Sequence, residues 1–480
     1  MAITLPDTTG FIRISGWTGE YNSGAGVSEQ ILFAGGVGIA NLGDGSNVAV
    51  FEQMAGRITA GDGDDRVFTK KPVGEALLGG GNNLLAAWDR VSTVMTGDGA
   101  DEIHLFGNGE GASIEVGGGD NTVSVADGTV WRIIAGAGAD SLTVDGAGEI
   151  DLGDGVNSLI AKSFISRLDG GSGVDTVVLG ADGAGPDSDA GIVNLGAGDD
   201  SFSASNWVNV LNTGEGNDTV NAVGGVNVTR LQAGDDVATV KTWFNILSAG
   251  TGSDTITTGD GNLLHLGNGH DTVEAAGAVS RIIAGGGADV IKALAQADFV
   301  SLGTGADTLG EAANPGAIGY ISEIDAGNGA DRLLGLAGAG TIDLGAHNDT
   351  LSVVGDVGIV YARQGRDDVT VEGSGTVFAG VGRDTLSNGE GTTHLFGQNA
   401  RDTFYFNDDA TAYDFFHGGR HRDTLVIEVR NADRRDEVEK ILDQYSGIRD
   451  DLTVKNGQKI MIGELNLEIV RIEAIEIEIV

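Results

Sequence analysis

A five-residue pattern, G-x-G-x-[DN], recurs along nearly the whole chain of 480 residues. Copies include GDGDD at 61–65, GDGAD at 97–101 and GTGAD at 303–307. The fifth residues of successive copies fall at positions 47, 65, 83, 101, 121, 140, 157, 175, 200, 218, 236, 254, 271, 289, 307, 331, 349, 367, 384, 402 and 423. Most intervals are therefore 18 residues. A fixed period of this length indicates a repeat architecture whose units stack on one another.

The residues between copies predict two short strands in each repeat. Each copy is followed by one residue and then by an apolar one, as at Val67, Ile103 and Phe202, and this alternation is typical of a strand with one buried face. A second apolar run, such as VNVL before Gly214, precedes the next copy. Neither strand can bury its inner face alone, so the units must stack. The sequence predicts an all-β fold, a right-handed parallel β-roll or β-solenoid with coils of about 18 residues.

The two long intervals and the chain ends suggest the domain organisation. We expect an N-terminal cap over residues 1–23, the roll over 24–427, and a C-terminal cap over 428–480. Loop insertions with a proline are expected near 180–190 and 310–320. The last segment predicts a small α+β cap. It contains an amphipathic helix after the N-cap residue Asn431, with Val438, Ile441, Leu442 and Tyr445 on its apolar face, and a hairpin turn at Asn456-Gly457.

The charge balance excludes several classes of function. Twenty-eight basic residues against 70 acidic ones give a net charge of −42, which disfavours binding to nucleic acid or to anionic lipid and attracts cations. The absence of cysteine excludes disulfides and thiolate chemistry. No apolar stretch is long enough to span a membrane. Neither H-E-x-x-H nor G-x-S-x-G occurs, so we expect no enzyme, no catalytic residue and no organic cofactor.

The repeat resembles the calcium-binding nonapeptide G-G-x-G-x-D-x-U-x of the repeat-in-toxin (RTX) family across roughly residues 24–427. The resemblance implies that two nonapeptides form one coil and that calcium lies between the loops of neighbouring coils. The residue types suit this role. Glycine permits the positive φ that turns carbonyl groups inward, aspartate adds a carboxylate, and calcium prefers oxygen ligands.

Only alternate half-coils keep the pattern, so we expect one row of Ca²⁺ sites, with roughly one site per coil. The expected ligands are the aspartates in the fifth position and the glycines of the most regular copies of the motif. The aspartates are Asp65, Asp101, Asp140, Asp175, Asp200, Asp218, Asp236, Asp254, Asp271, Asp289, Asp307, Asp331, Asp349, Asp367, Asp384, Asp402 and Asp423. The glycines are Gly61, Gly63, Gly97, Gly99, Gly171, Gly173, Gly214, Gly216, Gly250, Gly252, Gly285, Gly287, Gly303 and Gly305.

The fifth position alternates between asparagine and aspartate in the first eight copies. The order is Asn47, Asp65, Asn83, Asp101, Asn121, Asp140, Asn157 and Asp175. From Asp200 onward every copy carries aspartate, so we expect the tighter and more regular sites there, with the glycine-poor copies at 363–367 and 397–402 as exceptions. An alternative stays open, in which these residues only form hydrogen bonds within their own turns.

The C-terminal segment looks like the region of RTX proteins that carries an uncleaved type I secretion signal, and the N-terminus lacks the features of a cleaved signal. We therefore expect an extracellular or cell-surface protein. Surface-layer and matrix-like members of the family suggest a structural protein that folds on calcium and self-assembles into an extracellular layer or filament. Its partners would be further copies of the chain and a cell-surface polysaccharide. The alternative is a calcium-stapled adhesin or a glycan- or ice-binding protein, which would use an outward row such as Thr122, Thr176 and Thr219.

Overall fold

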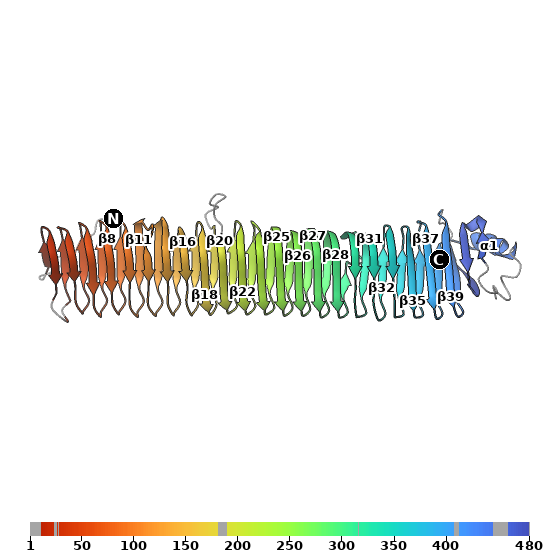
Figure 1. Ribbon diagram of the computed structural model, residues 1–480, viewed down its shortest axis with the longest axis horizontal. Helices are drawn as coiled ribbons and strands as arrows, with labels where there is room; N and C mark the ends of the chain where they lie inside the picture. Colours follow the sequence, from red (N-terminus) through yellow and green to blue (C-terminus); the bar gives the residue numbers. More distant parts are fainter. Residues whose placement is uncertain are drawn as a thin grey trace. The chain divides into compact units, whose positions relative to one another are not determined.

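The computed structural model describes residues 11–23, 26, 28–180, 190–314, 316–407, 412–444 and 459–479 (Figure 1). It divides into two compact units, an N-terminal unit of residues 1–242 and a C-terminal unit of residues 243–480. The first expected insertion, at 181–189, and the expected hairpin turn at Asn456-Gly457 lie outside the described residues.

Each repeat of the N-terminal unit contributes one strand before the motif and one after it. Strands of the same kind pair in parallel with those of the neighbouring coils; Val67, for example, is in register with Ala49 on one side and with Leu85 on the other. The strands that precede the motif are β2 (Thr18–Asn22), β4 (Val37–Asn41), β6 (Ala55–Ala60), β8 (Val73–Leu78), β10 (Val91–Met95), β12 (Ser113–Glu115), β14 (Thr129–Ile134), β16 (Gly146–Asp151), β18 (Ile165–Ser172), β20 (Ala190–Ala197), β22 (Val208–Glu215) and β24 (Val226–Ala233). The strands that follow it are β1 (Phe11–Ile14), β3 (Gln30–Phe33), β5 (Val48–Phe51), β7 (Arg66–Thr69), β9 (Leu84–Ala87), β11 (Glu102–Asn108), β13 (Thr122–Asp127), β15 (Ser141–Val144), β17 (Ser158–Ala161), β19 (Thr176–Leu179), β21 (Ser201–Ala204) and β23 (Thr219–Ala222).

The C-terminal unit continues the same plan, and β25 (Val237–Thr251) contains the boundary between the units. Four long strands run through both positions of a coil, namely β26 (Thr255–Asn268), β27 (Thr272–Gly286), β28 (Val290–Thr304) and β31 (Arg332–Asp343). The shorter strands before the motif are β30 (Ile318–Asp325), β33 (Val357–Tyr361), β35 (Gly375–Val381), β37 (Thr393–Asn399), β39 (Asp414–Arg420) and β42 (Leu467–Val470). Those after it are β29 (Thr308–Leu309), β32 (Thr350–Val353), β34 (Asp368–Val371), β36 (Thr385–Asn388), β38 (Thr403–Asn407), β40 (Thr424–Val429) and β43 (Ala474–Ile479).

The core of each unit is a thin apolar layer between its two sets of strands. The apolar residues predicted to point inward after the motif are all at most 1% exposed, which confirms the predicted alternation. They are Val67, Ile103, Val123, Leu142, Val177, Phe202, Val220, Ile256, Val273, Ile291, Leu309, Leu333, Leu351, Val369 and Leu386. The predicted parallel β-solenoid with coils of about 18 residues is thereby confirmed.

The motif glycines stack so closely that a side chain has no room. Gly287 has a φ of +131°, and a Cβ atom built on it would lie 1.6 Å from the carbonyl oxygen of Gly269 in the preceding coil. Only glycine meets both conditions, because it adopts positive φ without strain and brings no Cβ. The glycines therefore set the distance between neighbouring loops.

The C-terminal segment adds a helix and one further coil. Helix α1 (Ala432–Gln444) begins after Asn431, whose Oδ1 accepts a hydrogen bond of 2.9 Å from the Arg434 amide, as predicted for an N-cap. Its predicted apolar residues Val438, Ile441 and Leu442 are buried, whereas Tyr445 lies outside the described residues.

Strands β42 and β43 pair in parallel with β39 and β40, so they extend the stack by one coil. Strand β41 (Lys459–Ile462) pairs antiparallel with β42 through the short helix η1 (Gly463–Leu465). At the other end, β1 and β2 already pair with β3 and β4, so coil geometry begins within the segment expected to be an N-terminal cap. Among the described residues, no helix has the length and apolar character needed to cross a bilayer.

Candidate metal sites

The residues at the fifth motif position form a buried column in each unit. Every aspartate and asparagine at this position from Asn47 to Asp423 is at most 2% exposed. Charged side chains are rarely buried to this degree unless a hydrogen bond or a counter-charge compensates them. The compensation of each side-chain oxygen therefore decides what the column can bind.

One oxygen of each carboxylate is satisfied by the preceding coil. The backbone amide of Asp271 donates to Oδ1 of Asp289 over 2.9 Å, and the amide of Asp289 donates to Oδ1 of Asp307 over 2.8 Å. The same bond measures 2.7–3.1 Å through the N-terminal unit and 2.8–3.0 Å through the C-terminal unit. These bonds link neighbouring coils rather than closing single turns, and they orient the side chains that accept them.

The other oxygen has no partner. Buried Oδ2 atoms without a hydrogen bond occur at Asp65, Asp101, Asp140, Asp175, Asp200, Asp218, Asp271, Asp289, Asp307, Asp331, Asp349, Asp367, Asp384, Asp402 and Asp423. A buried polar atom left unsatisfied costs about 1–3 kcal/mol, and more when it is charged. A column of such atoms therefore needs a positive partner.

The asparagine coils show what surrounds this second side-chain atom. Nδ2 of Asn47 donates to the carbonyl oxygens of Gly43 and Gly45, over 3.3 and 2.8 Å. Nδ2 of Asn83 likewise donates to the first and third glycines of its own motif, over 3.1 and 3.0 Å. The place of Nδ2 is therefore a cradle of carbonyl oxygens.

The cradle also includes the next coil. Nδ2 of Asn121 donates to the carbonyl oxygen of Ala135, the residue before the following motif, over 3.3 Å. In a coil with aspartate at the fifth position, Oδ2 takes the place of the asparagine Nδ2 and faces the equivalent backbone carbonyl oxygens. Oxygen facing oxygen is repulsive unless a cation lies between them, and a hard cation that takes six to eight oxygen ligands suits the set.

Burial raises the pKa values of these aspartates. Desolvation raises the pKa of Asp65 to about 6 and that of Asp349 to about 7, against the smaller lowering effect of their hydrogen bonds. The pKa of Asp402 rises to about 8, by desolvation first and then by the nearby carboxylates of Asp384 and Asp423. In the absence of a metal ion, the column therefore holds protons more tightly than free aspartate does.

This pKa shift predicts the pH dependence of the metal-free chain. The folded-state pKa values lie above the value of 3.8 expected when unfolded, so protonation stabilises the fold fully below about pH 4, and this stability is lost as the pH rises through 6 to 8. Without calcium, the urea midpoint should be higher at pH 5 than at pH 8. In saturating calcium the difference should shrink or reverse, because protons and metal compete for the same oxygens. A metal-free chain that is more stable at pH 8 would contradict the buried carboxylate column.

Each candidate site combines few carboxylates with many carbonyls. All the expected glycine ligands except Gly61 and Gly97 carry the positive φ that turns the loops, for example +110° at Gly285 and +131° at Gly287. Within the described part of the chain, no group of three or more His, Asp or Glu side chains comes together to hold a metal ion. The backbone would therefore supply most of the ligands.

The glycine-poor copies keep the same arrangement. Arg363 and Gln398 replace the first glycine and adopt φ values of 71° and 70°, yet Asp367 and Asp402 remain buried with an unpartnered Oδ2. These two positions are geometrically equivalent to the regular ones, despite the doubt that their sequences raise.

Sequence analysis missed the last member of the column, Glu473. Its Oε2 accepts a hydrogen bond of 2.8 Å from the Asp423 amide, in the same way as an aspartate of the next coil. No G-x-G precedes Glu473, and Arg471 occupies the third motif position with a φ of 54°. Only the structure identifies this residue, because the parallel register of β40 with β43 places Glu473 opposite Asp423.

A family model of the RTX calcium-binding nonapeptide repeat matches residues 151–183, 207–238, 244–273, 280–309 and 325–353. No curated protein matches the chain in sequence. Among solved structures, the chain is similar to a hyperactive, Ca²⁺-dependent, β-helical antifreeze protein from an Antarctic bacterium, at 18% identity over 90% of each chain and a TM-score of 0.22. A TM-score this low carries no argument about the present chain.

Proposed function

Because the chain contains RTX calcium-binding nonapeptide repeats, we propose that it is a secreted structural protein that folds on calcium and self-assembles into an extracellular layer or filament. Residues 24–427 would form the calcium-binding roll, and residues 1–23 and 428–480 would close its ends. The proposal assigns no catalytic residue.

The observation that carries the proposal is the column of buried, unpartnered carboxylate oxygens. At Asp289, for example, Oδ2 and the carbonyl oxygens of Gly285 and Gly287 would hold one Ca²⁺ between neighbouring coils, by analogy with the amide contacts of Asn83. Each bound ion would cancel the repulsion between successive carboxylates, which at the spacing of neighbouring strands amounts to about 3–4 kcal/mol at an effective dielectric constant of 20.

Calcium would also set where the chain folds. Metal that binds only the folded state contributes its binding free energy to folding. The cytosol keeps free calcium far below the range of weak extracellular sites, so the chain would stay unfolded there and fold after export. RTX repeats are typical of secreted proteins, which supports an extracellular location.

Self-assembly is supported by large apolar side chains on the surface of the N-terminal unit. Trp17, between β1 and β2, is 68% exposed, and Trp131, in β14, is 69% exposed. Large exposed aromatic side chains are enriched at protein interfaces. They are therefore the first candidates for contacts between copies.

Sedimentation velocity without calcium and at about 1 mM calcium, within the range of weak extracellular sites, tests the proposal. We expect a slow, expanded chain to convert into very large species. W17S/W131S should fold with calcium, as judged by circular dichroism, but remain monomeric. Val156→Ser, which removes another well-exposed apolar side chain of the same unit, should assemble like the wild type. Conversion of the wild type to a compact monomer would contradict self-assembly and favour a ligand-binding role.

The ligand-binding alternative is weakened by the outward row that follows the motif. A binding face for a regular lattice should repeat one residue type coil after coil. Thr255, Thr272 and Thr308 belong to this row, but Val290 and Arg332 interrupt it in register. In the N-terminal unit, Arg66 and Glu102 occupy the same position.

A further inference from the structure

We propose that the loops of the last four copies of the motif, at residues 363–367, 380–384, 398–402 and 419–423, form a binding surface for an anionic polysaccharide. This surface is called the arginine loops below. The residue before the buried aspartate is arginine in all four, at Arg366, Arg383, Arg401 and Arg422, and each is exposed. In the six preceding copies of the unit, the same position holds Ser253, His270, Ala288, Ala306, Ala330 and Asn348.

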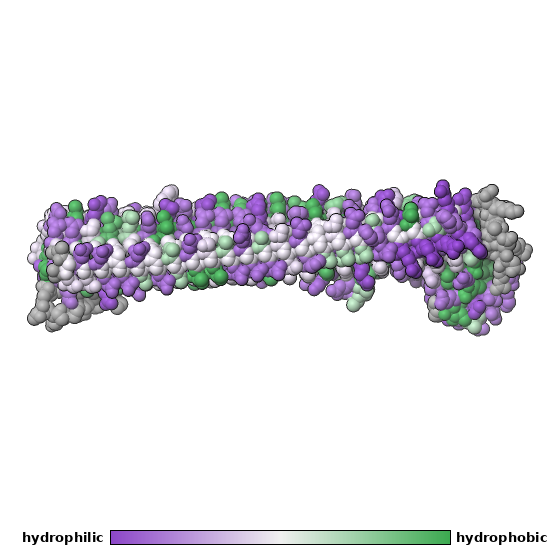
Figure 2. Space-filling view, turned by 90° about the horizontal axis from the view of Figure 1, so that it is seen from below, coloured by the Kyte–Doolittle hydropathy of each residue, from purple (hydrophilic) through white to green (hydrophobic). Residues whose placement is uncertain are grey.

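The four arginines lie in register along one edge of the unit. The strands that follow their loops pair in parallel, with Asp368, Thr385, Thr403 and Thr424 opposite one another. Successive arginines are therefore about 4.8 Å apart along the stack at their backbones. In Figure 2, strongly hydrophilic side chains gather as a dark band over this part of the C-terminal unit.

The arginines are not compensated within the chain. Among the described residues none of the four forms a salt bridge, whereas Arg363 pairs with Asp343 over 2.6 Å. They do not substitute for a metal ion either, because Oδ2 of Asp367, Asp384, Asp402 and Asp423 has no partner. Positive charges about 4.8 Å apart repel one another. The chain has 70 acidic residues, yet none of them pairs with these four arginines among the described residues. An external anion would relieve the repulsion.

The same loops hold side chains at positions where other copies have glycine. Arg363, Gln398, Ala400 and His421 adopt φ values between 70° and 89°. Residues other than glycine are strained at such positive φ values, and backbone strain of this kind concentrates at functional sites. Three of the four residues carry hydrogen-bonding side chains, so the strained positions add donors to the loop edge.

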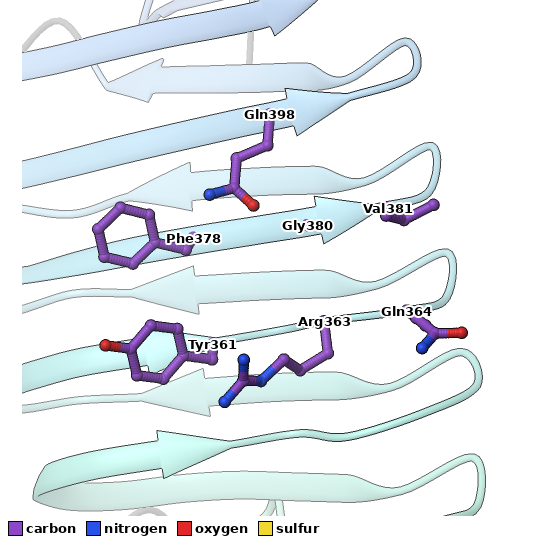
Figure 3. Close-up of a pocket in the computed structure, with 7 residues that line it drawn as sticks. All are labelled: Tyr361, Arg363, Gln364, Phe378, Gly380, Val381 and Gln398. Carbon is purple, nitrogen blue, oxygen red and sulfur yellow. The ribbon is translucent and has the colours of Figure 1, made fainter.

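Two hollows lie along this edge. The first, of about 460 Å³, has the rings of Tyr361 and Phe378 on one side and Arg363 and Gln398 on the other (Figure 3). The two ring centroids are 5.6 Å apart, and the Arg363 guanidinium lies 4.7 Å from the Tyr361 ring. The second, of about 260 Å³, is lined by Arg383, Arg401 and His421.

The aromatic rings and the Gln398 amide of the first hollow, together with the unpaired Arg383 and Arg401 of the second, suit a ring-shaped ligand that bears hydroxyl groups and a negative charge. Arginine binds carboxylate and sulfate through two parallel hydrogen bonds, and aromatic side chains pack against the apolar faces and edges of a sugar ring. Acidic loops of a second copy could neutralise the arginines, but short Asp and Glu side chains would leave the aromatic hollow unfilled. The combination therefore favours a polysaccharide with uronate or sulfated residues.

The test uses the calcium-loaded full chain and three probes, a short oligogalacturonate that does not gel with calcium, a sulfated dextran, and neutral dextran. We expect one or both anionic probes to bind, with an affinity that falls as NaCl rises, and no binding of neutral dextran. R383Q/R401Q should bind at least tenfold more weakly. R66Q/R281Q removes two exposed arginines that lie many coils from the arginine loops, and this variant should bind within about twofold of the wild type, because charges remote from the site contribute little at physiological salt.

Circular dichroism in calcium should show that both double variants are folded, so that a loss of binding reports the surface itself. Equal binding by R383Q/R401Q and the wild type would overturn the proposal, as would the absence of binding by both anionic probes. If neither probe binds and R383Q/R401Q abolishes assembly in sedimentation, the arginine loops contact a second copy instead, and the polysaccharide proposal is wrong. The binding outcomes do not depend on whether the wild type self-assembles, so they test this surface separately from the proposed assembly.

Discussion

Chelation of calcium at pH 8 is expected to unfold the C-terminal unit far more than the N-terminal unit. From Asp254 to Asp423 every coil of the C-terminal unit carries a buried aspartate, so neighbouring carboxylates are one strand spacing apart. At about 4.8 Å and an effective dielectric constant of 20, each adjacent pair would repel by about 3–4 kcal/mol if fully ionised. Summed over the stack, this repulsion exceeds the usual stability of a domain, about 5–15 kcal/mol.

The N-terminal unit spaces its charges more widely over its first eight copies. Between Asn47 and Asp175, carboxylates alternate with amides that are themselves hydrogen-bonded, so the distance between like charges doubles and the repulsion roughly halves. We therefore expect this stretch to retain part of its strand structure without calcium.

Hydrogen exchange measured by mass spectrometry, with and without chelator, resolves the two units. Amide protection in residues 254–423 should fall by at least 100-fold, equivalent to about 2.7 kcal/mol, and protection in residues 47–175 should fall less. Calcium should restore protection, and equimolar magnesium should not, because Mg²⁺ demands octahedral geometry and releases its water reluctantly. Unchanged protection in chelator would show that the column needs no metal.

Much of the fold could be predicted from the sequence because one constraint repeats. The period fixed the coil length, and the alternation after each motif identified the inward residues from Val67 to Leu386, all of which are buried. Because the same pattern occurs in every coil, an assignment made in one coil can be compared with the equivalent residues of many others. In the non-repetitive cap, the helix after Asn431 is confirmed, the turn at Asn456-Gly457 lies outside the described residues, and the pairing of β41 with β42 through η1 was not predicted.

The candidate site was predictable in its residues but not in its electrostatics. Sequence spacing identified the aspartates, yet only coordinates show that Oδ1 is bonded to the preceding coil while Oδ2 is left alone, as at Asp289. Glu473 was missed because it reaches the column through strand register without the glycine pattern. The arginine before each of the last four aspartates can be read from the sequence, but the alignment and exposure of the arginine loops depend on the stacking of the coils.

The second large effect is expected from exchanging aspartate and asparagine in the column. Asp289→Asn keeps the Oδ1 that accepts the Asp271 amide and supplies an Nδ2 that can donate to the carbonyl oxygens of Gly285 and Gly287, as Asn83 does in its own loop. The variant should lose about one Ca²⁺ per chain. Its metal-free form should be stabilised by about 1–3 kcal/mol, since a buried, unsatisfied oxygen becomes a hydrogen-bonded amide.

Asp289→Ala is the matched control, because it also removes the carboxylate but supplies no amide and breaks the bond from Asp271. It should lose the same calcium and be less stable than the wild type both with and without metal. The reverse change, Asn83→Asp, should add about one Ca²⁺ per chain and destabilise the metal-free chain, because it places three carboxylates, at 65, 83 and 101, in successive coils.

Equilibrium dialysis for calcium content and urea unfolding in chelator measure both halves of this prediction. The amide and the ion are alternative solutions to the same problem, a buried cradle of carbonyl oxygens that needs positive charge. If Asp289→Asn retained its calcium, or destabilised the metal-free chain as much as Asp289→Ala, the second side-chain atom would not lie at the metal position. If the aspartate and asparagine variants behave as expected, hydrogen bonds from the asparagine amides hold neighbouring coils of the N-terminal unit together without metal. The number of bound calcium ions then follows the number of aspartates in the column.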